Sequence, residues 1–416
     1  MPYDPTLPTK GFSRITTCLL LLVFCVLSGL AKTAQAQVRA YVASQDNNNL
    51  IIVDTGTNTV IGNVPISPNA FGLAVTPDGT RAYLTNTNNT VSVINTVTEA
   101  IVATVPVGSN ASGVVITPDS MRAYLSNSGS NTVSVIDTLT NTIVATIPVG
   151  GAPFKPVIAP DGRRVYVTNS TSESISVINT DTNTVVDTIF GIAGDMAITP
   201  DGTRLYVTTN TFFFTSVVTV IDTATDAVVT TIPINLQVLG LTFTPDSTRA
   251  YVLSRFEFSK VIDTATNTVT HLLHPGTLFD GMSVTPDSTR LYTSNLSFLS
   301  VSAIDTSTNA VLKRIPVSDF PIFSAVTPDG KRVYTANVLH TLSVIDTASN
   351  TEVAVIPLGD FPPNTFSAPG FILAPAPQAP RSKDDCKDGN YLKFDPPAGR
   401  FKNQGQCIKA FEARRL

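Results

Sequence analysis

A tyrosine flanked by apolar residues returns eight times along the 416-residue chain, about once every forty-one residues. The eight positions are Tyr41, Tyr83, Tyr124, Tyr166, Tyr206, Tyr251, Tyr292 and Tyr334. An Ile/Val-Asp/Asn-Thr step follows each of them, and a Pro-Asp-Gly or Pro-Asp-Ser turn precedes all but the first. A repeat of this length, built from short apolar runs, predicts a radial or stacked array of small sheets.

One repeat divides into four short runs. Three of them are Ala123–Ser126, Thr132–Ile136 and Ile143–Val149, and Gly113–Ile116 with its later counterparts is the fourth. Each run is bounded by Asn, Asp, Gly, Ser or Pro, which is typical of strands joined by tight turns. No stretch shows helical spacing of apolar residues over about ten residues or more. The sequence therefore predicts an all-β protein.

The fourth repeat carries the clearest family signature. It contains Val165-Tyr166-Val167-Thr168-Asn169, followed by Ser176-Val177-Ile178-Asn179-Thr180. These residues resemble the YVTN-family β-propellers of bacterial and archaeal surface and periplasmic proteins, and the resemblance spans residues 38 to about 376. The resemblance implies four-stranded blades around a central channel.

The number of blades follows from the incomplete first repeat. Eight hairpins are present but only seven complete Pro-Asp turns, because the first hairpin begins at Arg39 without an inner strand. Gly370–Pro375 is a degenerate copy of the inner-strand pattern. We expect this C-terminal strand to pair with Arg39–Ala43 and close an eight-bladed ring, which removes its open edges. Seven blades with a stray hairpin is the alternative.

The N-terminus predicts export. Lys10 and Arg14 precede an apolar run at residues 18–27, and Ala34-Gln35-Ala36 supplies small residues for cleavage before Gln37. This layout is typical of a signal peptide over residues 1–36. The apolar run is too short to span a membrane, although a retained N-terminal anchor is an alternative. We therefore expect a secreted, periplasmic or cell-surface protein.

The C-terminus predicts a small separate unit. We place the propeller at residues 37–376, a Pro/Ala linker at 377–382 and a tail at 383–416. Cys386 and Cys407 are the two cysteines left after signal removal, and in an exported protein they most simply form a disulfide. The tail resembles a short cysteine-paired tail of other secreted bacterial proteins.

The charge of the chain argues against nucleic acid as a partner. After residue 36 the chain has 24 basic and 30 acidic residues. Affinity for nucleic acid depends mainly on clustered Lys and Arg. A periplasmic single-stranded DNA binder is a third interpretation, because a YVTN relative suggests it, but Lys155, Arg255, Phe256 and Lys260 offer few basic and aromatic residues for it.

One face of the ring is the candidate recognition surface. The Pro-Asp and Asp-Thr turns are nearly uniform and share the opposite face, here called the turn face. The loops between second and third strands, and those entering the next inner strand, vary and share the loop face. We expect recognition on the loop face.

The inner strands present one variable position each, here called the rim position. The residues there are Gly72, Gly113, Lys155, Asp195, Gly240, Gly281, Phe323 and Phe371. Glycine lets the inner strands crowd the axis. Lys155 and Asp195 belong to successive blades and could meet at the channel mouth, with a purely structural ion pair or two solvated side chains as the alternative.

Aromatic residues are also expected on the loop face. They are Phe71, Phe154, Phe190, Phe279, Phe320 and Phe361, with Phe212, Phe213 and Phe214 in an enlarged hairpin loop. Exposed aromatic residues often contact a partner, although the insertion could pack on its own blade. The predicted binding residues are Lys155, Asp195, Phe154, Phe212, Phe213, Phe214, Phe279, Phe320 and Phe323.

The sequence favours recognition over catalysis. The three histidines, His271, His274 and His340, form no recognisable metal set, and haem, nucleophile-elbow and Walker motifs are absent. We expect a monomeric, non-enzymatic scaffold without a cofactor that binds an envelope or extracellular protein or a cell-surface glycan. The alternative is a propeller enzyme, lactonase-like or quinoprotein-type, with ionisable residues at the channel, among which Lys155 and Asp195 are the first candidates.

Overall fold

The computed structural model describes residues 38–44, 48–67, 70–209, 216–236, 238–254, 259–273, 281–359 and 370–375. The chain divides into two compact units, residues 1–37 and 38–416, and all described residues belong to the second. The predicted signal peptide, linker and tail, with Cys386 and Cys407, lie outside the described residues.

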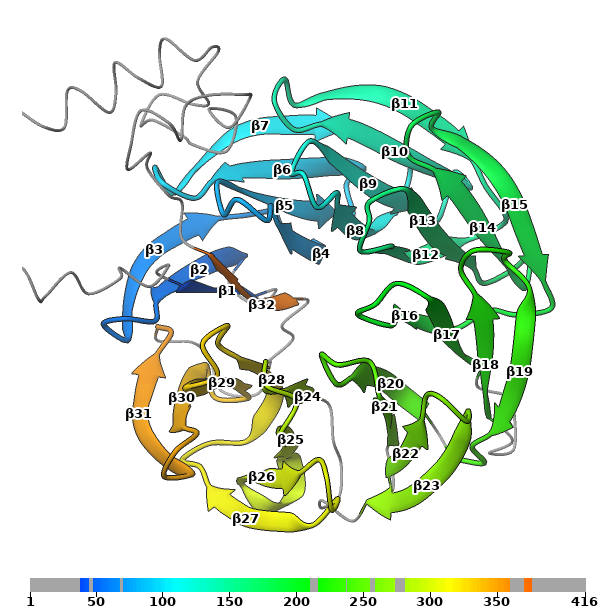
Figure 1. The fold of residues 1–416 in the computed structure, drawn as a ribbon. Coiled ribbons are helices and arrows are strands. Elements are labelled where there is room, and N and C mark those ends of the chain that lie inside the picture. Colours follow the sequence, from blue (N-terminus) through cyan, green and yellow to red (C-terminus); the bar gives the residue numbers. More distant parts are fainter. Residues whose placement is uncertain are drawn as a thin grey trace, which may run out of the picture. The chain divides into compact units, whose positions relative to one another are not determined.

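The fold is a ring of eight four-stranded antiparallel sheets, as the sequence predicts (Figure 1). The innermost strands are β32 (Gly370–Pro375), β4 (Ala70–Val75), β8 (Ala111–Ile116), β12 (Pro153–Ile158), β16 (Asp195–Ile198), β20 (Val238–Phe243), β24 (Met282–Val284) and β28 (Pro321–Val326). The second strands are β1 (Val38–Ser44), β5 (Arg81–Asn86), β9 (Arg122–Asn127), β13 (Arg164–Asn169), β17 (Arg204–Thr209), β21 (Arg249–Ser254), β25 (Arg290–Asn295) and β29 (Arg332–Asn337).

The third strands are β2 (Asn49–Asp54), β6 (Thr90–Asn95), β10 (Thr132–Asp137), β14 (Ser174–Asn179), β18 (Val217–Asp222), β22 (Ser259–Asp263), β26 (Ser300–Asp305) and β30 (Thr341–Asp346). The outermost strands are β3 (Thr59–Pro65), β7 (Ala100–Pro106), β11 (Thr142–Pro148), β15 (Thr184–Phe190), β19 (Val228–Pro233), β23 (Thr268–Leu273), β27 (Val311–Pro316) and β31 (Thr351–Pro357). A short 3₁₀ turn, η1 (Leu296–Phe298), follows β25.

The ring closes by pairing its two ends. Blade 1 consists of β32, β1, β2 and β3, and blades 2 to 8 are the successive groups of four strands from β4 to β31. Within blade 1, Arg39 lies opposite Ala374 and Ala43 lies opposite Gly370. The predicted C-terminal closing strand is therefore confirmed, and the second strand of blade 1 has no free edge.

The repeated tyrosines join neighbouring blades. All eight are fully buried. Tyr83 packs with Val93 of its own blade and Leu125 of the next, which shows that the core lies between blades. The Tyr124 hydroxyl also donates a hydrogen bond of 2.7 Å to the side-chain oxygen of Asn183, in the outer turn of the next blade. Apolar burial and one hydrogen bond thus act at the same interface.

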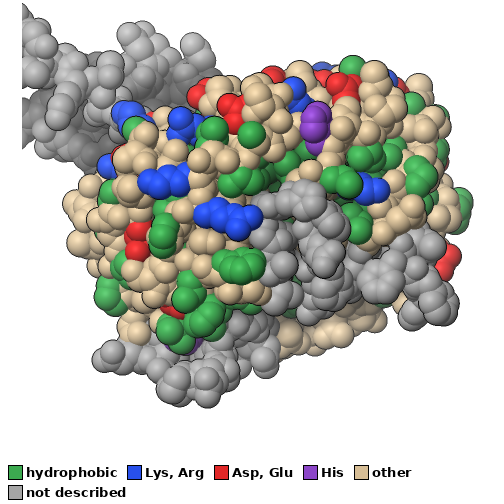
Figure 2. All heavy atoms as spheres, turned by 90° about the horizontal axis from the view of Figure 1, so that it is seen from below, with side chains coloured by type: hydrophobic (Ala, Val, Ile, Leu, Met, Phe, Trp, Pro, Cys, Tyr) green, Lys and Arg blue, Asp and Glu red, His purple; other side chains and the backbone are tan. Residues whose placement is uncertain are grey.

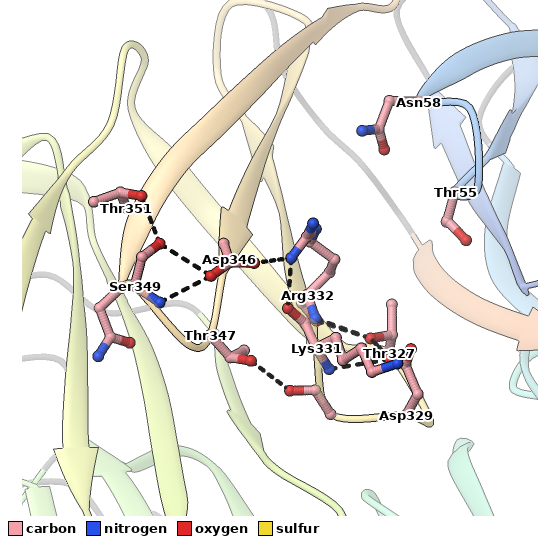
Figure 3. A network of polar contacts seen from close by, with 12 residues as sticks. Thr55, Asn58, Thr327, Asp329, Lys331, Arg332, Asp346, Thr347, Ser349 and Thr351 are labelled. Atoms are coloured by element: carbon pink, nitrogen blue, oxygen red, sulfur yellow. Dashed lines mark hydrogen bonds and ion pairs between the residues drawn. The ribbon is translucent and has the colours of Figure 1, made fainter.

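The turn face is a regular network of side-chain caps, drawn for blade 8 in Figure 3. The Asp346 carboxylate accepts hydrogen bonds from the Ser349 amide at 2.8 Å and the Ser349 hydroxyl at 3.0 Å, and it pairs with Arg332. The Thr347 hydroxyl donates to the Gly330 carbonyl at 2.7 Å, which joins the two turns of the blade. These contacts explain the near-uniform Asp, Thr and Gly pattern as scaffold chemistry.

The outermost strands expose apolar residues. Val144 is 50% exposed, Leu272 54% and Val353 51%, and each lies on an outermost strand. Figure 2 shows hydrophobic side chains scattered among charged and other side chains on one side of the molecule. Within the described ranges, no helix is both long and apolar enough to cross a bilayer.

Candidate functional site

The inner strands of blades 2 to 4 begin with an irregularity that places the rim residues. The pairing of β12 with β13 shifts between Pro153 and Pro156, which leaves Phe154 and Lys155 outside the regular ladder. The pairing of β4 with β5 shifts in the same way between Ala70 and Leu73. Such bulges re-aim side chains, so the rim residues are not restricted to the two faces of the sheet.

Hydroxyl groups two positions after the repeated tyrosines hold these inner strands. Thr85 donates to the Ser112 carbonyl of the next blade at 2.6 Å, and Thr168 donates to the Gly194 carbonyl at 2.9 Å. Ser126 likewise donates to the Phe154 carbonyl. In blades 2, 3 and 4 this threonine or serine therefore ties the inner strand of the following blade to its own blade.

Lys155 and Asp195 meet across the boundary between blades 4 and 5. The Lys155 ammonium nitrogen lies 2.9 Å from an Asp195 carboxylate oxygen. The Lys155 side chain is 52% exposed and the Asp195 side chain 31% exposed, so water and a ligand can reach both. The expected contact between these residues exists, and their role in binding stays a prediction.

Two phenylalanines extend this pair along the rim. The Lys155 ammonium lies 5.8 Å from the centre of the Phe154 ring, within the range of a cation–π contact. Phe154 in turn meets Phe71 edge to face, with ring centres 5.6 Å apart. Phe71 belongs to blade 2 and Phe154 to blade 4, so the two rings meet across blade 3. At the equivalent position of its inner strand, blade 3 has the small residue Ser112.

Glycine crowding holds for three of the four rim glycines. A Cβ on Gly72 would lie 2.4 Å from the Ser112 carbonyl oxygen, and one on Gly113 would lie 2.5 Å from Pro156. A Cβ on Gly281 would lie 2.6 Å from the Ile322 carbonyl oxygen. These glycines permit a close approach of neighbouring inner strands. A Cβ on Gly240 would meet no described atom within 4 Å, so the expectation of crowding is wrong there.

The other predicted site residues lie elsewhere. Phe323 is half-buried and packs against the apolar core between blades 8 and 1. Phe320 is 40% exposed in the loop before β28, and its amide donates to the buried Asp319 carboxylate at 2.6 Å. Phe212, Phe213, Phe214 and Phe279 lie outside the described residues.

Phe71 is the residue that the predicted binding set omitted. It precedes Gly72 as Phe154 precedes Lys155, so the repeat register places the two rings at equivalent positions. In the described part of the chain, no group of three or more His, Cys, Asp or Glu residues is arranged to hold a metal ion.

One family model matches part of the chain. The family model described as "Lactonase, 7-bladed beta-propeller" matches residues 73–187, well under half of the chain. The matched segment runs from β4 to β15 and includes Lys155, whereas the ring here has eight blades. No curated protein matches the chain.

Solved structures share the fold. Hydrazine synthase of Kuenenia stuttgartiensis is 24% identical with a TM-score of 0.54, covering 68% of this chain and 96% of its own. The dihydro-heme d1 dehydrogenase NirN is 18% identical with a TM-score of 0.68, covering 77% of this chain and 73% of its own. At these identities the likeness concerns the fold alone.

The expectation of a non-enzymatic scaffold is wrong, because the matching family model describes an enzyme family and favours the enzyme alternative. That expectation rested on the scarcity of ionisable residues at the rim. The ring nevertheless brings two of them, from blades 4 and 5, to within 2.9 Å of each other. Proximity in the fold, and not the number of charged residues, decides whether a rim can carry chemistry.

Proposed function

We propose that this propeller hydrolyses lactones at the rim where Lys155 and Asp195 meet. The match of residues 73–187 to the lactonase propeller family carries the proposal. The Lys155–Asp195 pair supports it, because a partly exposed carboxylate beside an ammonium group offers a base and a cation to the same ligand.

The chemistry needs only these two groups and water. The Asp195 carboxylate accepts a proton from a water molecule whose oxygen attacks the lactone carbonyl carbon. The Lys155 ammonium stabilises the negative charge that develops on the carbonyl oxygen. The bond between the carbonyl carbon and the ring oxygen then breaks, and the ring oxygen takes the proton from Asp195. The product is the open hydroxy acid, and Asp195 returns to its carboxylate form.

Lactone hydrolysis by the full chain tests the proposal. We expect Asp195→Asn and Lys155→Ala each to lower kcat/KM by about 100-fold or more, as is usual for loss of a proton-transfer group or of an oxyanion stabiliser. Lys331→Ala is the matched control, because Lys331 lies 3.9 Å from the Asp329 carboxylate on the turn face. Wild-type activity in both rim variants, or no hydrolysis of any lactone, would contradict the proposal.

A second proposal concerns the repeat class, the export and the C-terminal tail of the chain. We propose a YVTN-repeat protein that is exported after cleavage near Ala36 and that carries a tail closed by a Cys386–Cys407 disulfide. The repeat signature and the N-terminal pattern support this. The mass of the protein recovered from the source cells tests cleavage, and thiol titration before and after reduction tests the disulfide.

A further inference from the structure

We infer that the substrate is an uncharged lactone carrying an apolar substituent, not a phosphorylated or polyhydroxylated one; this inference rests on the proposed function. The geometry points to Phe71 and Phe154 as the surface that binds the substituent. Successive contacts join the two rings to the Lys155–Asp195 pair: Phe71 meets Phe154, Phe154 meets Lys155, and Lys155 meets Asp195.

The position of the rings suits a substituent on the reacting ring. Lys155 is shared between the two parts of the site: its ammonium lies 2.9 Å from the Asp195 carboxylate and 5.8 Å from the Phe154 ring centre. A lactone whose carbonyl oxygen contacts the ammonium therefore has the Phe154 ring within reach of its next few carbon atoms. Phe71 continues the apolar surface and remains 40% exposed.

Contacts with neighbouring side chains define the apolar surface. The two rings pack edge to face at an angle of 64°. Ser112, between them in the blade order, keeps its hydroxyl engaged with the Ser126 hydroxyl at 2.9 Å. Because the intervening residue is small, the rings can meet across blade 3 and present one continuous apolar edge.

The charges at the rim argue against an anionic substrate. Lys155 is the only basic residue among the eight rim positions, and its ammonium already pairs with Asp195. A phosphate group bound there would face the Asp195 carboxylate, which repels it, with no second cation at a rim position to compensate. An uncharged ring avoids this repulsion.

A series of γ-lactones with 4-alkyl chains from methyl to hexyl tests the inference, because only the chain changes while the reacting ring stays the same. We expect kcat/KM of the full-length protein to rise about two- to fourfold per methylene, because a buried methylene contributes about 0.8 kcal/mol. Phe71→Ser should remove this rise for the longer chains, which reach past Phe154 to Phe71, whereas Phe71→Leu should retain most of it because the side chain stays apolar.

Phe298→Ala is the matched control. Phe298 is a 56% exposed phenylalanine in the turn after β25 of blade 7, and its loss should leave the chain-length dependence unchanged. Two results would overturn the inference and leave the proposed function intact. One is hydrolysis without chain-length dependence, and the other is a kcat/KM for gluconolactone equal to that for the long-chain γ-lactones. An unchanged dependence in Phe71→Ser would overturn the assignment to the aromatic pair. Hydrolysis of no lactone would overturn the inference together with the proposed function.

Discussion

Glu99 occupies a turn position at which the other seven blades have asparagine or aspartate. The outer turn of every blade holds one residue with positive φ: Asn58, Glu99, Asn141, Asn183, Asp226, Asn267, Asn309 and Asn350. Seven of these residues accept a hydrogen bond from the tyrosine hydroxyl of the preceding blade. Tyr41, which precedes Glu99, has a buried hydroxyl without a hydrogen-bond partner in the described part of the chain.

Replacement of Glu99 by asparagine should therefore stabilise the protein. Glutamate has a steric cost at its φ of 55° that asparagine largely avoids, and this cost is about 1 kcal/mol. A hydrogen bond from the Tyr41 hydroxyl to the introduced amide oxygen adds about 0.5 to 1.5 kcal/mol. The sum predicts a rise of about 1.5 to 2.5 kcal/mol in the free energy of unfolding, which is a rise of a few degrees in Tm.

The pH dependence gives this prediction a second test. Burial raises the pKa of the Glu99 carboxyl above its ordinary value of 4.5. The unfolded chain therefore loses this proton at lower pH than the folded one, so the carboxyl destabilises the fold increasingly as pH rises through 4.5 and above. The advantage of Glu99→Asn should be larger at about pH 7 than at about pH 4.

Urea unfolding at both pH values measures the effect. Asn183→Glu is the matched reverse change, and it should cost about as much as Glu99→Asn gains. In a Tyr41→Phe background no tyrosine hydroxyl can donate to the introduced asparagine. The stabilisation by Glu99→Asn should therefore fall by the hydrogen-bond contribution and keep the steric contribution. An unchanged midpoint for both Glu99→Asn and Asn183→Glu would refute the claim that asparagine is more stable than glutamate at this turn position.

Three further changes follow from the same contacts. Tyr124→Phe should lower the free energy of unfolding by about 1 kcal/mol in urea titration, because it removes the hydrogen bond to Asn183. Tyr41→Phe should lower it little, because the Tyr41 hydroxyl has no partner among the described residues. Equal losses in the two variants would contradict this. Hydrogen bonds, first that from the Ser307 hydroxyl, lower the pKa of Asp305 from 3.8 to about 2, so its stabilising contribution is present above pH 3.8 and is lost as pH falls through about 2. Asp305→Asn should therefore lose less stability than wild type on acidification. Circular dichroism from about pH 5 to about pH 2 measures this, and the same acid unfolding curve for both proteins would contradict it. Truncation before residue 370 removes β32 and exposes the edge of β1, so calorimetry should show a Tm lower by several degrees, and an unchanged Tm would contradict the closure argument.

The ring could be predicted because its determinants are local and repeated. The tyrosine period set the number of hairpins, and the lone pattern at Gly370–Pro375 supplied the missing strand of blade 1. The Lys155–Asp195 contact could also be anticipated, because the two residues hold equivalent positions in successive blades.

The aromatic part of the site could not be predicted in the same way. The Phe71–Phe154 contact joins blades 2 and 4, and it depends on the small Ser112 between them and on bulges that shift the pairing of the inner strands. Nothing in the repeat register indicates where a bulge re-aims a side chain. The place of Phe323 in the core between blades is likewise a result of packing that the aromatic pattern does not reveal.

Lactone hydrolysis at the Lys155–Asp195 pair is best tested by the initial rate of acid release from γ-decalactone, followed by pH-stat with the full-length wild-type protein and with Asp195→Asn. We expect steady hydrolysis by the wild type and a rate lower by about 100-fold in the variant, with the same urea midpoint for both. Hydrolysis at equal rates would show that the Lys155–Asp195 pair does not carry the chemistry, and its absence in the wild type would contradict lactone hydrolysis at this rim.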